Sequence, residues 1–449
     1  SFPYICLIKS PSVLLVLAPK ITNRLRYIFN LLLNDLLGLE TCFTASLDEF
    51  STYEGAKFSY GVSLESDALF FAANHLLFET GISSCEVSCF DYAGSKAFFA
   101  VYQKSSAMPF DVFAASFFLV SRYEEYLPQM RDEHGRFRAM QSEAYRNGFL
   151  RKPLVNSWAL ELKKVLQDRF PELEFSLPSF KFIPTIDVDA AFAYKHKGMT
   201  RAVGGFFKAI NRSDYQELRE RIEVLLGRRA DPFDTYEVIM ALQKKYSLKT
   251  LFFILLADYG VNDKNLPVQN RYFRQIIREL ADYADVGIHP SYASSGNAAV
   301  LQKEISRLSG ILHRDILKSR QHFLRLEMPT TYRNLINCDI AEDYTMGYAE
   351  EAGFRASICS PYNFFDLDLD RKTPLRIFPF ALMDGTLNDY MDLTPVQASD
   401  LISNLMKEVK AVGGTFISLW HNSTLNDQRH WKGWLMVYED MIRLAVKGK

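Results

Sequence analysis

The sequence predicts an α/β protein in which a distorted (β/α) barrel follows a smaller α/β or α+β domain. Apolar runs typical of buried strands recur through the second half of the chain, and stretches with the apolar spacing of helices lie between them. Several of these strands end in an aspartate or a histidine. Repeated strands that each deliver a polar group at the carboxyl end are typical of the active-site rim of an α/β barrel.

Chain length and composition predict two domains. A chain of 449 residues is too long for one typical hydrophobic core. A serine- and proline-containing segment at 176–179 precedes the first strand of the second half, so we expect domains at 1–177 and 178–449. Aromatic residues make up 14% of the chain, which is enough for large cores and for a cleft that stacks on sugar rings.

In the N-terminal domain, helices are expected to flank short strands. Apolar residues at helical spacing predict helices at 21–37 and 68–78, and an almost wholly apolar run predicts a buried helix at 109–120. The apolar run at 13–18 predicts a strand. It is too short to span a bilayer and short for the core of a signal peptide, so we expect no membrane span and a cytoplasmic location. Because the chain begins at Ser1, a removed leader is left open.

In the C-terminal domain, strands and helices are expected to alternate. Buried strands are predicted at 180–186, 252–256, 285–290 and 415–422. Helices are predicted at 236–246, 272–283 and 299–312. This alternation is typical of a parallel barrel built from βα units.

The charge balance and the cysteines argue against several classes of protein. With 52 basic and 53 acidic residues the net charge is −1, so no global field attracts nucleic acid or an anionic membrane, and we expect no nucleic-acid partner. Six cysteines in so long a chain do not make a disulfide scaffold. We expect Cys85 and Cys89 to be free core thiols. The oligomeric state is not predicted.

The first strand of the C-terminal domain ends in two aspartates, Asp187 and Asp189. Side chains two residues apart in a strand point the same way, so the two carboxylates are expected to lie together. Two crowded carboxylates favour neutralisation of one by a proton or a cation. That arrangement suits a metal-ligating carboxylate beside a carboxylate that acts as a base. The alternative is an aspartate that caps the following helix and a second one on the surface.

The order of five short motifs resembles the polysaccharide deacetylases of the NodB-homology type, which are metal-dependent carbohydrate esterases. The motifs are TIDVD, LFFIL, GIHPS, the arginine motif SRQHF at 319–323, and LWHN. The resemblance is closest to members whose first motif is D-V-D or D-V-E, and it spans about residues 180 to 430. The whole chain resembles the two-domain polysaccharide deacetylase-like proteins of Bacteroides-type bacteria.

The resemblance implies a role for each aspartate and for His289. Asp187 would be the general base, and Asp189 and His289 would be metal ligands. The family pattern after the first histidine is H-x-x-x-H, but Ala293 stands where the second histidine is expected. Either another side chain supplies the ligand, or water completes a weaker site, or the site has lost its metal.

His322, in the arginine motif, is the candidate for the missing ligand, and a histidine packed beside Phe323 is the alternative. His196, on a basic stretch after the aspartates, is a less favoured candidate. Arg320 corresponds in the resemblance to the arginine that pairs with the catalytic aspartate, and we count it among the residues that bind substrate. An ordinary surface arginine is the alternative reading of Arg320.

His421 falls where the family has the histidine of an L-H-D motif, which protonates the leaving amine. Asn422 departs from that motif, so the partner of the imidazole is missing or comes from elsewhere. Trp420 is either a core aromatic or a platform for a sugar ring. Asp384 is either a turn residue or part of the pocket rim, and with Trp420 and Arg320 it completes the predicted substrate-binding residues.

Together these features predict a hydrolase that removes N- or O-acetyl groups from a carbohydrate with a divalent metal, for which zinc is expected. A divalent metal lowers the pKa of a bound water from about 15.7 to about 7, which amide or ester hydrolysis near neutral pH requires. Two alternatives follow from Ala293 and Asn422 and from the breadth of chemistry that one fold supports. The first is an inactive glycan-binding or regulatory protein of the same fold. The second is an amidohydrolase that acts on a small non-peptide amide, in which case the partner is an acetylated small molecule.

Overall fold

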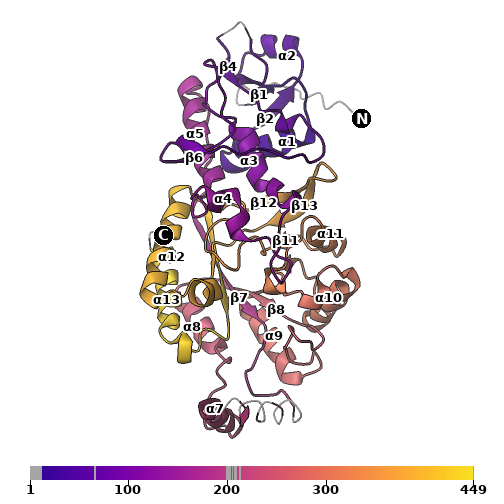
Figure 1. Cartoon of the computed structure of the whole chain (residues 1–449), viewed down its shortest axis with the longest axis vertical. Coiled ribbons are helices and arrows are strands. Elements are labelled where there is room, and N and C mark those ends of the chain that lie inside the picture. The colour runs from indigo at the N-terminus through magenta and orange to yellow at the C-terminus, as the bar shows by residue number, and fades with distance from the viewer. Residues whose placement is uncertain are drawn as a thin grey trace.

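The computed structural model describes residues 13–64, 67–198 and 214–447, together with 204, 206 and 210–211. Ser1, on which the question of a leader depends, lies outside these ranges. The described residues form two main sheets, a small one near the N-terminus and a large one in the rest of the chain (Figure 1), together with a two-stranded hairpin of β5 (Phe90–Tyr92) and β6 (Ser95–Ala97). None of the helices in the described ranges is long and apolar enough to cross a membrane.

The N-terminal module, by which we mean residues up to 177, is built on a four-stranded parallel sheet in the order β2-β1-β3-β4. The strands are β1 (Leu14–Leu17), β2 (Thr41–Thr44), β3 (Lys57–Tyr60) and β4 (Leu69–Phe71). Its longer helical elements are α1 (Asn23–Phe29), which continues into the π-helix η1 (Asn30–Leu36), α3 (Val112–Val120) and α5 (Leu154–Arg169). Phe29 and Phe113 stack at 3.8 Å between ring centroids and join α1 to α3.

The C-terminal part is built on a nine-stranded sheet in the order β12-β13-β11-β10-β9-β8-β7-β15-β14. Neighbouring strands are parallel except β12 and β13. The strands are β7 (Lys181–Val188), β8 (Leu251–Ile254), β9 (Asp285–Ile288), β10 (Lys318–Ser319), β11 (Glu342–Asp343), β12 (Tyr362–Asp366), β13 (Arg371–Ile377), β14 (Leu382–Met383) and β15 (Thr415–His421). In the described residues the series of paired strands ends at β12 and β14, so closure into a barrel stays a prediction.

Helices cover the large sheet on its flanks (Figure 1). The helices beside the sheet are α8 (Tyr236–Lys245), α9 (Arg271–Tyr283), α10 (Ala298–Leu312), α11 (Thr330–Asn337), α12 (Pro395–Ala411) and α13 (Trp434–Val446). Helix α7 (Tyr215–Leu225) lies at the far end of the molecule, below the sheet in Figure 1. Helix α9, for example, presents an apolar stripe at helical spacing and buries Phe273, Ile277 and Leu280. Thr394 and Gln397 form a capping box that starts α12.

The structure confirms most of the predicted elements and corrects one. The strands predicted near 252, 285 and 415 and the helices predicted near 236, 272 and 299 are present, as is the buried helix α3. The segment 68–78 is not a helix but the strand β4 followed by a single 3₁₀ turn at His75–Leu77. Its apolar residues are spaced for either structure, and pairing of β4 with β3 decides between them. Cys85 and Cys89 are free, as expected, but they are half-buried and not core residues, whereas Cys42 is disulfide-bonded.

A buried ion pair joins the N-terminal module to the C-terminal part. Glu125 accepts hydrogen bonds from Arg355 Nη2 at 2.6 Å and Nε at 2.8 Å, and from Arg122 Nε at 2.7 Å. All three side chains are almost fully buried. Burial opposes ionisation of Glu125, but the two guanidinium groups outweigh it and lower the pKa of the carboxyl to about 2.

Candidate metal centre and catalytic pocket

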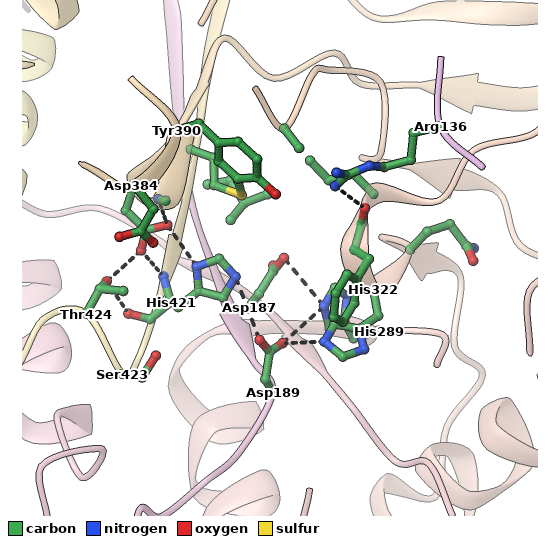
Figure 2. Close-up of a pocket in the computed structure, with 18 of the residues that line it drawn as sticks. Arg136, Asp187, Asp189, His289, His322, Asp384, Tyr390, His421, Ser423 and Thr424 are labelled. Atoms are coloured by element: carbon green, nitrogen blue, oxygen red, sulfur yellow. Dashed lines mark hydrogen bonds and ion pairs between the residues drawn. The ribbon is translucent and has the colours of Figure 1, made fainter. Parts of the chain in front are cut away.

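The side chains of the candidate site lie at the carboxyl ends of parallel strands. Asp187 and Asp189 lie at the end of β7, and His421 is the last residue of β15, where it is paired in register with Asp187. His289 follows β9 directly, and Asp384 follows β14. These five residues line a cavity of about 350 Å³ (Figure 2). The structure thus brings together Asp187, Asp189, His289 and His421, as the sequence predicts.

Asp187 is held by Arg320, the first residue after β10. Arg320 Nη1 lies 3.0 Å from Asp187 Oδ1, and its Nε donates to the Tyr344 carbonyl at 2.9 Å. The guanidinium is fully buried and also lies 4.7 Å from the centre of the Phe253 ring. Arg320 therefore contacts the aspartate, as the resemblance implies, and its assignment as a substrate-binding residue is wrong because its side chain does not reach the cavity.

Asp189, His289 and His322 converge on one point. Each offers a ligand atom, and the three atoms lie within 4.8 Å of one another. His289 Nε2 lies 3.3 Å and His322 Nε2 3.6 Å from Asp189 Oδ1. That oxygen is buried and accepts no hydrogen bond from any described residue. One carboxylate and two imidazoles are a donor set that suits zinc, and the unpartnered oxygen faces the centre of the set.

The histidines of this cluster are oriented by bonds to their other ring nitrogens. His289 Nδ1 lies 2.5 Å from the Arg320 carbonyl, which can only accept, so Nδ1 donates and Nε2 faces the two aspartates. His322 Nδ1 lies 2.9 Å from Asp263 Oδ1. Carboxylate or carbonyl partners of this kind fix the tautomer and the orientation of metal-binding histidines.

Neighbouring charges in the cluster favour a negative Asp189 and a positive His322. Burial disfavours ionisation of Asp189, but His322, His289 and His421 outweigh it and hold the pKa of the carboxyl well below its ordinary value. Burial likewise disfavours the charged form of His322, but Asp189 and Asp263 raise its pKa to about 9. The negative field that holds a proton on His322 is the field that would attract a cation.

Asp263 explains how the site tolerates Ala293. The Asp263 carboxylate accepts the backbone N–H groups of Tyr292 at 2.9 Å and Ala293 at 3.4 Å, and it also bonds His322. The segment expected to supply a second histidine therefore anchors the carboxylate that orients His322. The third candidate ligand, His322, comes instead from the loop that follows the neighbouring strand β10.

His421 faces the cluster from the opposite side of the cavity (Figure 2). Its Nε2 lies 3.9 Å from Asp189 Oδ2, and its Nδ1 lies 2.8 Å from Asp384 Oδ1. Asp384 also accepts from the His421 backbone N–H at 2.7 Å and from Thr424 Oγ1 at 2.5 Å. Burial opposes protonation of His421, but Asp384, Asp189 and Asp187 raise its pKa to about 10. Asp384 is therefore the hydrogen-bond partner of the imidazole, and because it also lines the cavity its assignment as a substrate-binding residue stays a prediction.

Asn422 forms hydrogen bonds with backbone carbonyl groups. Its Nδ2 donates to the carbonyls of Ala190 at 3.0 Å and Phe233 at 2.9 Å, and its side chain is buried. A carboxylate has no proton to donate to these carbonyls. The departure from the L-H-D motif therefore has a structural reason, because Asn422 ties down the loop that follows Asp189.

Trp420 and His196 do not belong to the cavity. Trp420 is fully buried and packs against Tyr438 at 5.1 Å and Trp434 at 6.3 Å between ring centroids. It is a core aromatic, and its assignment as a substrate-binding residue is wrong because no ligand can reach it. His196 stacks on Tyr272 at 3.9 Å and is not part of the cluster.

Sequence reasoning missed three residues of the site. Asp263 lies in the loop after β8, where an acidic residue past a strand end was the only available signal. Thr424 supports Asp384 but resembles any loop threonine in the sequence. Arg136 reaches the cavity from the N-terminal module, and no local pattern in the sequence connects it to residues about 190 positions away.

Comparisons with known proteins bear on the two parts of the chain separately. A model of a family of unknown function (DUF7033) matches residues 14–171. No curated protein matches the sequence. Among solved structures, similarity is found to a protein from Mycobacterium smegmatis assigned to the polysaccharide deacetylases, with 13% identity over 61% of this chain and 85% of that chain and a TM-score of 0.41.

Two further structures are similar over the same extent. One is a polysaccharide deacetylase from Bacillus cereus, with 11% identity, a TM-score of 0.27, and coverage of 59% of this chain and 85% of that chain. The other is the CE4 domain of a multidomain xylanase from the hindgut metagenome of Trinervitermes trinervoides, with 11% identity, a TM-score of 0.27, and coverage of 59% and 82%.

Proposed function

We propose that this protein is a metal-dependent hydrolase that removes N- or O-acetyl groups from a carbohydrate. One observation carries the proposal: three ligand atoms of Asp189, His289 and His322 lie within 4.8 Å of one another at the wall of a cavity that also holds Asp187 and His421. A base, an acid and a set of metal ligands around one cavity are the parts that hydrolysis of an amide or ester needs.

The residues present fit a divalent metal, and we expect zinc. Asp189 Oδ1 and the Nε2 atoms of His289 and His322 would hold it, and three protein ligands leave a position open for water or substrate. When bound, the metal would polarise the acetyl carbonyl and lower the pKa of water at the open position.

Asp187 is suited to accept a proton from the attacking water. Its Oδ2 lies 3.7 Å from His289 Nε2, so the carboxylate borders the metal ligands, and Arg320 holds the other oxygen at 3.0 Å. The buried guanidinium thus fixes the orientation of the carboxylate and leaves Oδ2 directed toward the metal ligands. Arg320 therefore positions Asp187 and does not itself touch substrate.

His421 is suited to donate a proton to the leaving nitrogen or oxygen. Asp384 accepts from Nδ1 and leaves Nε2 directed toward the cavity. The raised pKa, about 10, keeps the imidazole protonated near neutral pH, as a general acid requires. The pair of His421 and Asp384 thus takes the place of the histidine and aspartate that adjoin in the family motif.

The cavity favours a sugar ring as substrate. Aromatic side chains of Phe323, Tyr390 and Trp431 line it together with polar groups such as Gln321 and Ser423. Flat aromatic surfaces beside hydrogen-bonding groups suit the apolar faces and hydroxyls of carbohydrates. A volume of about 350 Å³ lies at the low end for ligand pockets and suits one sugar residue at the reacting position.

The N-terminal module is proposed to be a separate domain that ends at residue 177. The separation of the two sheets along the chain supports this division, and the family model that matches 14–171 stops just before it. Membership of the two-domain Bacteroides-type proteins stays a prediction.

Acetate release tests the proposal. The full chain, purified without chelator, should release acetate from N-acetylated or O-acetylated oligosaccharides, lose this activity with a chelator, and regain it with Zn²⁺. His421→Ala should slow amide cleavage strongly and spare aryl acetates, since their leaving group needs little protonation. No acetate from any acetylated sugar, from a protein that holds zinc, would favour a binding role. Equal losses on amide and aryl ester would mean that His421 orients substrate and does not donate a proton.

A further inference from the structure

A hairpin of the N-terminal module lies against the wall of the cavity. We call residues 131–137 the hairpin: Arg131 and Phe137 form an antiparallel bridge, and Asp132 N–H donates to the Arg136 carbonyl at 3.0 Å. Asp132 Oδ1 accepts the backbone N–H groups of His134 and Arg136 at 2.9 and 2.8 Å, which closes the turn. Arg136 is the hairpin residue that lines the cavity (Figure 2).

The turn that carries His322 has an unfavourable backbone. Phe323 and Leu324 have φ angles of 59° and 54°, so two consecutive residues with Cβ atoms adopt the left-handed conformation. Residues other than glycine rarely adopt the left-handed conformation, because it brings their Cβ atom close to the following carbonyl oxygen. Such a turn persists only where its surroundings hold it.

Three contacts from the hairpin hold this turn. Arg136 Nη1 donates to the Phe323 carbonyl at 3.1 Å, and Arg325 Nε donates to the His134 carbonyl at 2.9 Å. The rings of His134 and Phe323 meet edge to face at 4.9 Å between centroids. Arg136 is itself fixed, because its Nε bonds Asp132 Oδ2 at 2.6 Å and its side chain is nearly buried.

We propose that the N-terminal module is part of the metal centre, in which Arg136 acts as a positioning residue that holds the turn carrying His322. The proposal rests on the proposed function, because it assigns His322 to the metal. Asp263 of the C-terminal part orients the His322 ring, at 2.9 Å, and the hairpin of the N-terminal module fixes the backbone that carries the ring. The module thereby compensates for the histidine that is replaced by Ala293.

The geometry explains why the third ligand depends on another part of the chain. His289 follows β9 directly, and the sheet fixes its position. His322 lies three residues beyond the two-residue strand β10, and its backbone N–H donates to the Pro290 carbonyl at 3.0 Å. A ligand so weakly held by the sheet needs support from outside it.

Zinc affinity of Arg136 variants tests the proposal without reference to activity. Zn²⁺ would be titrated calorimetrically into the metal-free full chain of wild type, Arg136→Ala and Arg136→Lys. Loss of the groups that support metal ligands typically weakens binding about 10–100-fold, and we expect a loss in that range for Arg136→Ala. Lysine can still donate to the Phe323 carbonyl, so Arg136→Lys should recover part of the affinity.

Arg138→Ala is the matched control. Arg138 belongs to the same module and pairs with Glu350 of the C-terminal part at 3.4 Å, and its hydrogen bond goes to that carboxylate and not to the backbone of the turn. Its variant should bind Zn²⁺ within about two-fold of wild type. The absorption spectrum of bound Co²⁺ should change in Arg136→Ala in the same direction as in His322→Ala but by less, because Arg136→Ala loosens the nitrogen ligand that His322→Ala removes.

The possible outcomes distinguish the proposed role of the N-terminal module from the proposed metal site itself. Wild-type zinc affinity in a folded Arg136→Ala variant would overturn the role of the module and leave the metal site intact. Equal losses in the Arg136 and Arg138 variants would also overturn it, since they would reflect a general loosening of the interface. If Arg136→Ala does not fold, the affinity of Arg136→Lys decides, and a wild-type value together with an unchanged cobalt spectrum overturns the proposal. Failure of wild type to bind zinc would overturn the proposed function as well.

Discussion

At the scale of residues, the two aspartates at the end of β7 have different partners. Asp187 is buried against the guanidinium of Arg320, whereas Asp189 faces the imidazoles of His289 and His322. Two side chains of the same type are therefore suited to different roles: the Asp187 carboxylate to that of a base, and the Asp189 carboxylate to that of a metal ligand. This division of roles follows from the surroundings of each side chain and not from its identity.

Replacing Asp187 by asparagine should remove the base and preserve the metal. The substitution keeps the size of the side chain, and general-base loss typically lowers the rate by about 10²–10⁴-fold, so we expect kcat to fall in that range. Zinc content should stay at the wild-type level, because Asp187 is not among the three clustered ligands. Activity within a few-fold of wild type would reassign the base.

Replacing Asn422 by aspartate should destabilise the protein, although it restores the family motif. Asn422 donates to the carbonyls of Ala190 and Phe233, and a carboxylate there would leave both acceptors without a donor. A buried group that loses its partner typically costs about 1–3 kcal/mol, and a charged one costs more. Denaturant unfolding measures the change. A variant as stable as wild type would show that these two bonds contribute little.

The sequence indicated part of the site at this scale. Asp187, Asp189, His289 and His421 are recognisable because each ends an apolar run, so a local pattern marks them. Asp263 and Asp384 escaped assignment to their histidines because the pairs are separated by 59 and 37 positions. Trp420 was misassigned because a strand-end tryptophan has the same local sequence whether it faces the cavity or the core.

At the scale of elements, the carboxyl ends of neighbouring parallel strands bring distant residues together. Strands β7, β8, β9 and β15 are four residues or longer and are rich in apolar residues, and these were predicted. Strands β10, β11 and β14 have two residues each, which is too short for any periodicity to show. Their place in the sheet comes from pairing with neighbours, which sequence alone does not reveal.

The ion pair of Glu125 with Arg355 and Arg122 should make the interface sensitive to acid. The folded-state pKa of Glu125, about 2, lies below the ordinary value of 4.5, so its contribution is fully present above pH 4.5 and is lost as the pH falls toward 2. Glu125→Gln should lower the free energy of unfolding at pH 7 by about 3–5 kcal/mol, the usual cost of breaking a buried pair.

Unfolding of both proteins over a pH series checks this expectation. The difference in unfolding free energy between wild type and Glu125→Gln should shrink as the pH falls below about 4.5, because protonated glutamate and glutamine are alike in charge. A difference that stays constant down to pH 3 would show that the charge of Glu125 does not stabilise the interface.

At the scale of the whole molecule, one hydrophobic core runs through both parts of the chain. Phe117 of α3 packs against Phe365 of β12 at 5.1 Å between ring centroids, and Tyr27 of α1 packs against the same ring at 4.9 Å. Arg24 of α1 pairs with Asp370 at 2.8 Å. These contacts join the N-terminal module to the edge of the large sheet, and the hairpin at 131–137 extends the contact to the candidate metal centre.

The central claim is that Asp189, His289 and His322 form a metal site, and zinc titration tests it most directly. The metal-free full chain should bind one Zn²⁺ per molecule, and His322→Ala should weaken binding by more than the roughly 10–100-fold that loss of a supporting residue costs. His196→Ala is the control, since His196 stacks on Tyr272 away from the cluster, and it should bind as wild type does. A wild-type protein that binds no zinc, or a His322→Ala variant that binds it with undiminished affinity, would contradict the account.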